Sequence, residues 1–204
     1  MANALSSQKE RAFLVVEKES RRTSLEEFMR VYADKEDEYK YEWNAGIIEK
    51  TKRINQQQAI IQAVLFRTFA TTKVFKEGGL LTAETDMHTS SEQLRRPDLA
   101  IYTKAQLDKM KVGEYQIAKW TAEVISENDN INHVQSKLQE YFDAGVEVVW
   151  QIFPNFKHVY VYTAVNQVQI CSGDMICSTK SAFPDFEIKA KLIFEQLGLS
   201  IFSR

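Results

Sequence analysis

Two short apolar segments of the chain each carry a single carboxylate. Asp98 follows Pro97, which fits the first position of a strand, and precedes the apolar run 99–101, typical of a strand buried on both faces. Glu123 lies in a second apolar segment, residues 121–126. A buried carboxylate is costly unless a cation neutralises it. Two such acids on neighbouring strands therefore predict a site for a divalent metal.

Two further charged residues belong to this candidate cluster. Glu42 lies in the aromatic segment 39–43, just before an Asn-Ala-Gly turn, a pattern that predicts a β-hairpin. Lys137 lies on a predicted helix from about Asn132 to Ala144, which Gly145 would close. If this helix packs beside the acidic strand ends, the Lys137 ammonium points into the carboxylates.

These residue types suit the hydrolysis of a phosphodiester bond. Carboxylate oxygens are preferred ligands of Mg²⁺ and Mn²⁺, which keep bound waters and accept phosphate oxygens. Such a metal lowers the pKa of a bound water and neutralises charge at phosphorus. A lysine beside it adds positive charge where negative charge develops. The pattern favours a nuclease centre with Asp98 and Glu123 as metal ligands.

Pro97-Asp98 followed by Glu123-Val124-Ile125 resembles the PD-(D/E)XK nuclease superfamily, although Ile125 stands where the lysine is expected. In one branch the lysine lies on the following helix, and the chain resembles the Uma-two family of restriction-endonuclease-like proteins. The segments that match this family are, in chain order, 41–46 (YEWNAG), 96–100 (RPDLA), 122–126 (AEVIS), 137–146 (KLQEYFDAGV) and 149–150 (VW). The resemblance covers about Ser24 to Phe194, nearly the whole chain.

The resemblance implies a restriction-endonuclease-like fold, DNA as the substrate, and Mg²⁺ as the cofactor, with Mn²⁺ as a substitute. It implies that Asp98 and Glu123 bind the metal, with the Val124 carbonyl as a further ligand. Glu42 would be the acid from the first structural element, and Lys137 would be the displaced active-site lysine.

Three positions depart from the family pattern. Gln57 stands where the family usually has a histidine, Phe153 replaces an aspartate before proline, and Glu127 follows Ser126 where Pro-Ser is expected. The four central residues, Glu42, Asp98, Glu123 and Lys137, are all present. The departures therefore bear on substrate handling and on the turnover rate.

The predicted elements run helix, hairpin, helix, strands, helix and strands. A capping box between Thr23 and Glu27 marks the start of the first helix, in either of two registers. This order predicts an α/β (mixed α+β) fold in which a mixed central sheet is flanked by helices. We expect an N-terminal arm at residues 1–22 and a single domain over residues 23–204.

The distribution of charge bears on the binding of DNA. A net charge of −2 argues against a chain that is basic throughout, but basic residues cluster locally. Such clusters are most often solvated surface; beside an acidic centre they also suit phosphate contacts. The candidate DNA-backbone contacts are Lys50, Lys52, Arg53, Arg95 and Arg96.

Other site classes are disfavoured by the sequence. No apolar run approaches the roughly 18–20 residues of a membrane span, so we expect no membrane association and a cytoplasmic location. Cys171 and Cys177 lack CxxC spacing, and the three histidines lie in separate predicted elements, which argues against zinc.

Several of these residues also have a simpler interpretation. Glu42 would serve as a solvated cross-strand partner, Tyr141 as a packing residue, and His133 as a surface residue one turn before Lys137. Gln151 is either a strand-edge polar group or a hydrogen-bonding partner within the site.

Two function classes stay open, and a third, an unrelated metal-binding hydrolase, is less favoured. One is a metal-dependent DNA endonuclease that uses Asp98, Glu123 and Lys137. The other is a catalytically weak or inactive nuclease fold that acts as a DNA-binding or dimerisation module. The resemblance and the aromatic-rich strands favour a homodimer.

Overall fold

The structure is a computed structural model that describes residues 22–52, 55–127 and 129–195. Of the predicted N-terminal arm at 1–22, only Arg22 lies inside these ranges. Arg53 and the segment 196–204 also lie outside them. The predicted domain limits therefore stay a prediction. None of the helices in the described ranges has the length and apolar character needed to cross a membrane.

Helices occur at both ends of the described chain and between its strands. In chain order they are α1 (Leu25–Val31), α2 (Gln56–Phe69), α3 (Lys73–Lys76), α4 (Lys104–Met110), α5 (Ile131–Ala144) and α6 (Ala190–Glu195).

The strands form a mixed sheet of six strands and an antiparallel sheet of four strands, with a further two-stranded ribbon. The six-stranded sheet has the order β10 (Gln167–Cys171), β9 (His158–Ala164), β8 (Val148–Phe153), β7 (Trp120–Val124), β6 (Leu99–Tyr102) and β3 (Leu80–Thr82). The four-stranded sheet has the order β2 (Ile47–Lys52), β1 (Tyr39–Asn44), β5 (Gln93–Arg95) and β4 (Met87–Ser90). The ribbon pairs β11 (Ile176–Ser178) with β12 (Glu187–Lys189).

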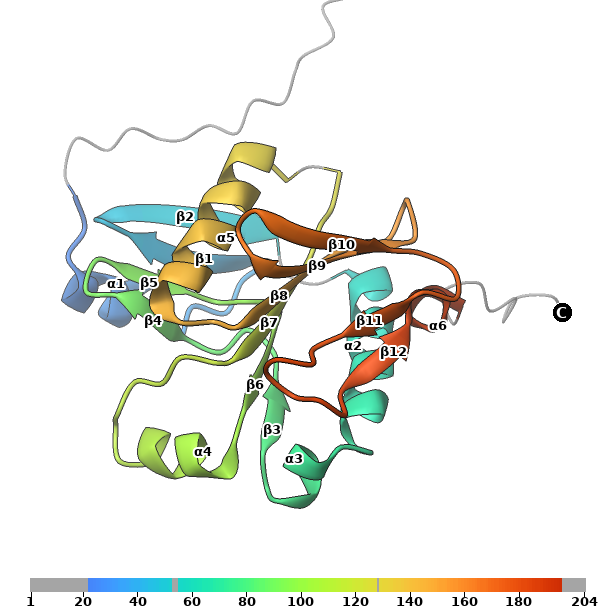
Figure 1. The fold of residues 1–204 in the computed structure, drawn as a ribbon. Helices are drawn as coiled ribbons and strands as arrows, with labels where there is room; N and C mark the ends of the chain where they lie inside the picture. Colours follow the sequence, from blue (N-terminus) through green and yellow to red (C-terminus); the bar gives the residue numbers. More distant parts are fainter. Residues whose placement is uncertain (1–21, 53–54, 128, 196–204) are drawn as a thin grey trace, which may run out of the picture.

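Helices cover both faces of the six-stranded sheet (Figure 1). On one face, α2, α6 and the β11–β12 ribbon enclose a core in which the Trp150 ring stacks on Phe186 at 5.7 Å and meets the edge of Trp120 at 5.2 Å. On the opposite face, Leu138 and Tyr141 of α5 pack against the sheet. The predicted fold class, a mixed central sheet flanked by helices, is confirmed. The four-stranded sheet is an addition that the sequence did not predict beyond its first hairpin.

Local signals fix the ends of α5, the helix that carries Lys137. The side chain of Asn130 accepts hydrogen bonds from the backbone N–H groups of Asn132 and His133, at 2.9 and 3.4 Å. Gly145 ends the helix at φ +102°, a conformation that glycine adopts without strain. The predicted helix is therefore confirmed to within one residue at its start.

Strand register brings the two predicted metal ligands together. In the antiparallel pair β6–β7, Leu99 lies opposite Ala122, so Asp98 and Glu123 occupy the next pair of positions at the ends of these strands. Side chains directly opposite across an antiparallel pair have Cβ atoms about 5 Å apart. The pairing of β6 with β7 therefore places the Asp98 and Glu123 carboxylates next to each other at the same edge of the sheet.

The aromatic cluster predicts where the fold is most sensitive to truncation. We expect Phe186→Ala to lower the free energy of unfolding by about 3–5 kcal/mol, because its ring is buried between Trp120 and Trp150. Phe156→Ala is the matched control, since Phe156 is 71% exposed, and should change stability by less than about 0.5 kcal/mol. Urea denaturation followed by fluorescence measures both; equal effects would contradict the assignment of the core.

Candidate active site

Asp98 is buried at the start of β6, and both of its carboxylate oxygens have partners. Oδ2 accepts a hydrogen bond from the Val124 backbone N–H at 2.8 Å. Oδ1 lies 2.7 Å from the Nζ atom of Lys40. The backbone of Val124 also faces the site through its carbonyl oxygen, which accepts a hydrogen bond from Gln58 Nε2 at 3.1 Å. Of the predicted ligand residues, Asp98 is thus hydrogen-bonded directly to the backbone of Val124, and Glu123 is the residue before Val124 on β7.

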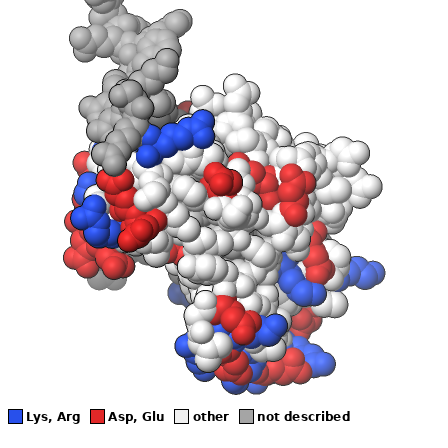
Figure 2. All heavy atoms as spheres, turned by 90° about the vertical axis from the view of Figure 1, so that its left-hand side faces the viewer, with Lys and Arg blue, Asp and Glu red and all other residues white. Residues whose placement is uncertain are grey.

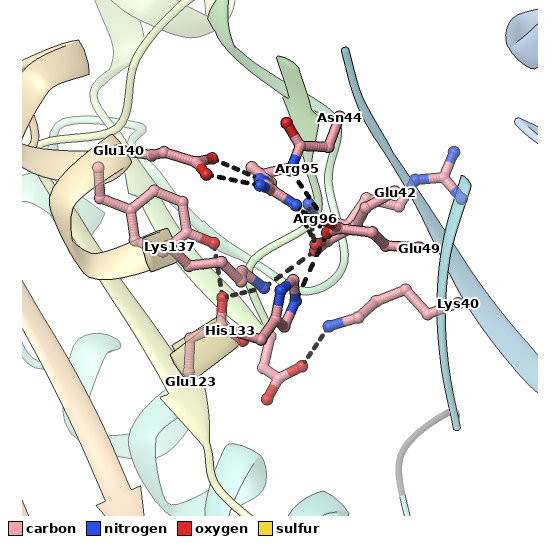
Figure 3. Close-up of polar contacts among 12 residues, drawn as sticks. Lys40, Glu42, Asn44, Glu49, Arg95, Arg96, Glu123, His133, Lys137 and Glu140 are labelled. Atoms are coloured by element: carbon pink, nitrogen blue, oxygen red, sulfur yellow. Dashed lines mark hydrogen bonds and ion pairs between the residues drawn. The ribbon is translucent and has the colours of Figure 1, made fainter. Parts of the chain in front are cut away.

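Lys137 reaches the acids from α5, as predicted. Its Nζ lies 2.9 Å from Glu123 Oε1 and 3.1 Å from Glu42 Oε1, and the side chain is buried. Burial opposes the charge of Lys137, but the attraction of Glu123 and Glu42 outweighs it, so the pKa of the ammonium lies above its usual value. The lysine is therefore a fixed positive charge between two carboxylates (Figure 3).

Glu123 receives a second donor from α5, one turn beyond Lys137. The hydroxyl of Tyr141 donates to Glu123 Oε1 at 2.5 Å. Burial raises the pKa of Tyr141 well above its usual value, with the negative charges of Glu123 and Glu42 adding to the effect. Burial also raises the pKa of Glu123, against the opposing attraction of Lys137. Tyr141 is both a packing residue, as the sequence favoured, and a hydrogen-bond donor to the site, which the sequence missed.

Glu42 is buried on β1 and is not a solvated cross-strand residue. Its Oε1 accepts a hydrogen bond from the Arg96 backbone N–H at 2.9 Å, and its Oε2 lies 3.4 Å from Arg95 Nη1. Burial opposes its charge, but Lys137, Lys40 and Arg95 outweigh this cost and lower the pKa of Glu42 to about 2. Glu42 is therefore the acid that ties the first hairpin to α5.

Lys40 is a site residue that the sequence analysis did not single out. It is buried, and its ammonium pairs with Asp98 on the same side of β1 as Glu42. Burial opposes its charge, but Asp98, Glu123 and Glu42 outweigh the cost and raise the pKa of Lys40 above its usual value. The sequence contained one signal for Lys40: it lies two residues before Glu42, and residues two apart on a strand share a face.

Arg95 lies inside this ion-pair network. It is fully buried, and its guanidinium binds the carboxylate of Glu140 through two hydrogen bonds of 2.6 and 2.7 Å. Its Nη1 also pairs with Glu42 and with Glu49. A DNA phosphate does not reach a buried guanidinium that carboxylates already surround, so the predicted DNA contact does not fit the placement of Arg95. The Arg95 guanidinium instead neutralises the charges of Glu42, Glu49 and Glu140.

Arg96 is only partly buried and has partners of its own. Its Nε pairs with Asp86, and its Nη2 donates to the carbonyl oxygen of Ala33 at 2.8 Å. These contacts hold Arg96 at the entry to β6, where its backbone N–H binds Glu42. The predicted DNA contact of Arg96 would require these side-chain partners to be exchanged.

The remaining predicted DNA contacts lie on the first hairpin. Lys50 and Lys52 are exposed on β2, with the Lys50 ammonium 3.5 Å from the centre of the Tyr39 ring; Arg53 lies outside the described residues. Figure 2 shows the face of the molecule that carries α1 and the four-stranded sheet, where acidic and basic side chains are intermingled. Among the described residues drawn there, the basic groups form no continuous band.

A second group of possible ligands lies beside the predicted one. Single ligand atoms of Glu42, Glu49 and His133 lie within 4.8 Å of one another. Arg95 already pairs with both glutamates, so its positive charge opposes a cation at this place. His133 Nε2 lies 3.5 Å from Glu49, which shows that this histidine faces the network. We therefore assign the trio to the network and not to a metal.

A cleft of about 280 Å³ opens beside the Val124 carbonyl. It lies where β7 and β8 end and α2 begins, the usual place for ligands at the carboxyl ends of neighbouring parallel strands. Amide and hydroxyl groups line much of it, from Gln57, Gln58, Ser126 and Asn155. Of the predicted ligand residues, Val124 lines this cleft, whereas Asp98 and Glu123 are not among its lining residues.

Comparison with known proteins assigns the family. The sequence profile of Uma2, described as "Putative restriction endonuclease", matches residues 25–191. The chain belongs to the Uma2 family. A solved structure described as a "putative nuclease belonging to DUF820" from Anabaena variabilis ATCC 29413 is 18% identical, with a TM-score of 0.72. That match covers 84% of this chain and 97% of the other, and it shows the same fold. Comparison with curated proteins gives no match.

Membership of Uma2 confirms the resemblance drawn from the sequence motifs, and the structure locates the departures from the family pattern. Gln57, which stands in place of a histidine, lines the cleft beside Val124. Phe153, which stands in place of an aspartate, packs against the Tyr160 ring at 4.7 Å. The first departure therefore lies in the cleft, and the second is an apolar contact on the central sheet.

The donor groups of this Uma2 protein fit a hard divalent cation. Asp98 and Glu123 supply carboxylate oxygens from adjacent strand positions, and Val124 supplies a carbonyl oxygen, the ligand types that Mg²⁺ and Mn²⁺ prefer. Asp98 Oδ1 pairs with the ammonium of Lys40, whose stem is flexible, whereas the Arg95 guanidinium is held by three glutamates. The residues present therefore fit the metal that the sequence predicted.

The lowered pKa of Glu42 predicts how the free energy of unfolding depends on pH. A carboxylate whose pKa falls from 4.5 to about 2 on folding stabilises the protein above pH 4.5 and loses that effect as the pH falls toward 2. We expect wild type to exceed Glu42→Gln by about 3 kcal/mol in unfolding free energy at pH 6, at 1.36 kcal/mol per pKa unit. This difference should shrink below pH 4.5.

Urea denaturation between pH 3 and pH 7 measures this difference. Glu114→Gln is the matched control, because Glu114 is exposed and should change stability by less than about 0.5 kcal/mol. A Glu42→Gln difference that stays constant down to pH 3 would contradict the ion-paired state of Glu42.

Proposed function

We propose that the protein is a metal-dependent DNA endonuclease that hydrolyses phosphodiester bonds at the centre formed by Asp98, Glu123 and Lys137. Membership of a family described as "Putative restriction endonuclease" and the fold shared with a structure described as a "putative nuclease" support the nuclease class. The observation that carries the proposal is the position of the Lys137 ammonium, 2.9 Å from Glu123 and 3.1 Å from Glu42. A buried lysine among acids is costly to maintain, and such charges concentrate at functional sites.

Each residue has a distinct part in the proposed reaction. Asp98, Glu123 and the Val124 carbonyl would hold Mg²⁺ or Mn²⁺, which supplies an activated water and neutralises phosphate charge. Lys137 stays protonated, since its pKa is raised, and places a positive charge where the attacked phosphate gains negative charge. Tyr141 fixes Glu123 through its 2.5 Å hydrogen bond.

The alternative is a nuclease fold that binds DNA or dimerises without efficient cleavage. The substitutions at Gln57 and Phe153 favour this alternative, because they lie at the cleft and on the central sheet where the family pattern has other groups. The same cleavage experiment separates the two classes.

A homodimer and a cytoplasmic location are part of the proposal. The edge strand β10 supports the dimer, because it presents Val168 and Ile170, each 46% exposed, beside an unpaired strand edge in the described sheet. Exposed apolar edge strands pair readily with another chain.

The first test of the proposal is cleavage of supercoiled plasmid with Mg²⁺ or Mn²⁺. We expect wild type to cut, and Asp98→Asn, Glu123→Gln and Lys137→Met each to lower the rate by about 100-fold or more. The reason is that each substitution removes a charge that binds the metal or stabilises the phosphate.

Asp108→Asn is the matched control for Asp98→Asn. Asp108 is exposed on α4, where it pairs with the surface residues Lys104 and Lys111, so cleavage should be unchanged. Cutting that persists in Asp98→Asn would mean that a contaminant or another centre is responsible. A wild-type protein that cuts with neither metal would favour the binding module.

A second test concerns the predicted DNA contacts on β2. Lys50→Gln and Lys52→Gln should each weaken DNA binding without metal and reduce the slope of log K against log salt by about 1, because each releases one counterion fewer. Lys111→Gln on α4 serves as the control, since Lys111 is equally exposed but far along the chain from the hairpin. Fluorescence anisotropy at several salt concentrations measures the slopes, and unchanged slopes would exclude these lysines as contacts.

A further inference from the structure

Lys40 occupies the position at which the proposed metal would bind Asp98. Its side chain is 6% exposed, and its Nζ lies 2.7 Å from Asp98 Oδ1. The other oxygen of Asp98 is held by the Val124 backbone N–H at 2.8 Å. A cation that binds Asp98 through Oδ1 must therefore share that oxygen with the ammonium or replace it.

The surroundings of Lys40 favour replacement over sharing. A divalent cation and an ammonium on one oxygen repel each other strongly, because the buried site screens charge far less than water does. Lysine has a long, flexible stem whose charged end can move while the backbone stays fixed. The backbone of Lys40 is held by β1, whose neighbouring residues Tyr41 and Trp43 are buried on the opposite side of the strand.

Lys137 is placed differently and does not compete in the same way. Its ammonium bridges Glu42 and Glu123 and has no contact with Asp98 among the described ion pairs. Two lysines therefore divide the three acids between them, and only Lys40 is bound to the acid at the start of β6. The difference gives the two lysines different roles.

We propose that Lys40 is a built-in counter-ion that holds Asp98 in the metal-free protein and is displaced when the divalent metal binds. Lys40 thus neutralises Asp98 while no metal is bound, and its competition with the metal sets how much metal is needed to fill the site, whereas the Val124 N–H keeps Asp98 in place. This inference rests on the proposed function, because it takes Asp98 as a metal ligand.

Binding of Mn²⁺ alone to the full chain tests the proposal, with isothermal titration calorimetry as the measurement. Lys40→Met removes the competing charge while keeping a similar stem, so we expect Mn²⁺ to bind about tenfold tighter or more. Lys40→Arg keeps a positive charge and should stay within about threefold of wild type. A purely structural lysine would give the opposite result, since its loss would disorder Asp98 and weaken binding.

Two controls separate this inference from the proposed function. Lys119→Met removes a lysine that pairs with Glu147 at the same 2.7 Å distance on the surface, at the other end of β7, and should leave Mn²⁺ affinity unchanged. Asp98→Asn should abolish the Mn²⁺ site in both the wild-type and the Lys40→Met backgrounds. If Asp98→Asn abolishes binding but Lys40→Met does not tighten it, the inference is wrong and the metal site stands. If Asp98→Asn leaves binding unchanged, both are wrong.

A measurement on the wild-type protein covers the case in which Lys40→Met does not fold. Ammonium signals of ¹⁵N-labelled lysine report ion-paired side chains, and loss of one signal in Lys40→Arg identifies Lys40. We expect Mg²⁺ to shift or remove the Lys40 signal in step with binding. A Lys40 signal that is unchanged at saturating Mg²⁺ would overturn the proposal.

Discussion

The balance of charge around two buried carboxylates, Glu42 and Asp98, and the partly buried Glu123 holds several elements of the described structure together. Glu42, Asp98 and Glu123 come from separate strands, and each is matched by a lysine or arginine from another part of the chain. An ion buried without a partner costs several kcal/mol, so the acids and their cations must come together as a set. The first hairpin, the ends of β6 and β7, and α5 are therefore fixed relative to one another by the same contacts that form the candidate site.

The sequence predicts the acids better than it predicts their partners. Asp98 and Glu123 stand out in the sequence because burying a carboxylate in an apolar strand is costly unless a cation neutralises it. The β6–β7 register then places the two residues side by side. Lys137 is predicted from its place on the helix. Lys40 was missed although it lies two residues before Glu42 and so shares its face of β1, because alternation alone does not show that this face is buried.

Arg95 shows why the second sheet limits prediction from sequence. β4 and β5 are short and their residues carry no clear alternation, so the segment 87–95 gives little signal of its own. Pairing of β5 with β1 places Arg95 opposite Glu42, one position beyond the pair Trp43–Leu94. A basic doublet that suggests a surface contact with DNA is therefore turned inward by long-range strand pairing, which no local pattern reveals.

The position of Lys137 on a helix has a consequence for how the site is assembled. Ile125 directly follows β7 and stands two residues after Glu123, where the superfamily pattern has its lysine, so the strand supplies no positive charge there. The positive charge beside Glu123 comes instead from Lys137 on α5. The same helix carries Tyr141, which is bound to Glu123, and Glu140, which is bound to Arg95. A lysine on the strand would be placed by the sheet alone, whereas here the charge is in place only when α5 is docked. The candidate centre is thus complete only in the fully packed protein, because its acids and its lysine belong to different layers.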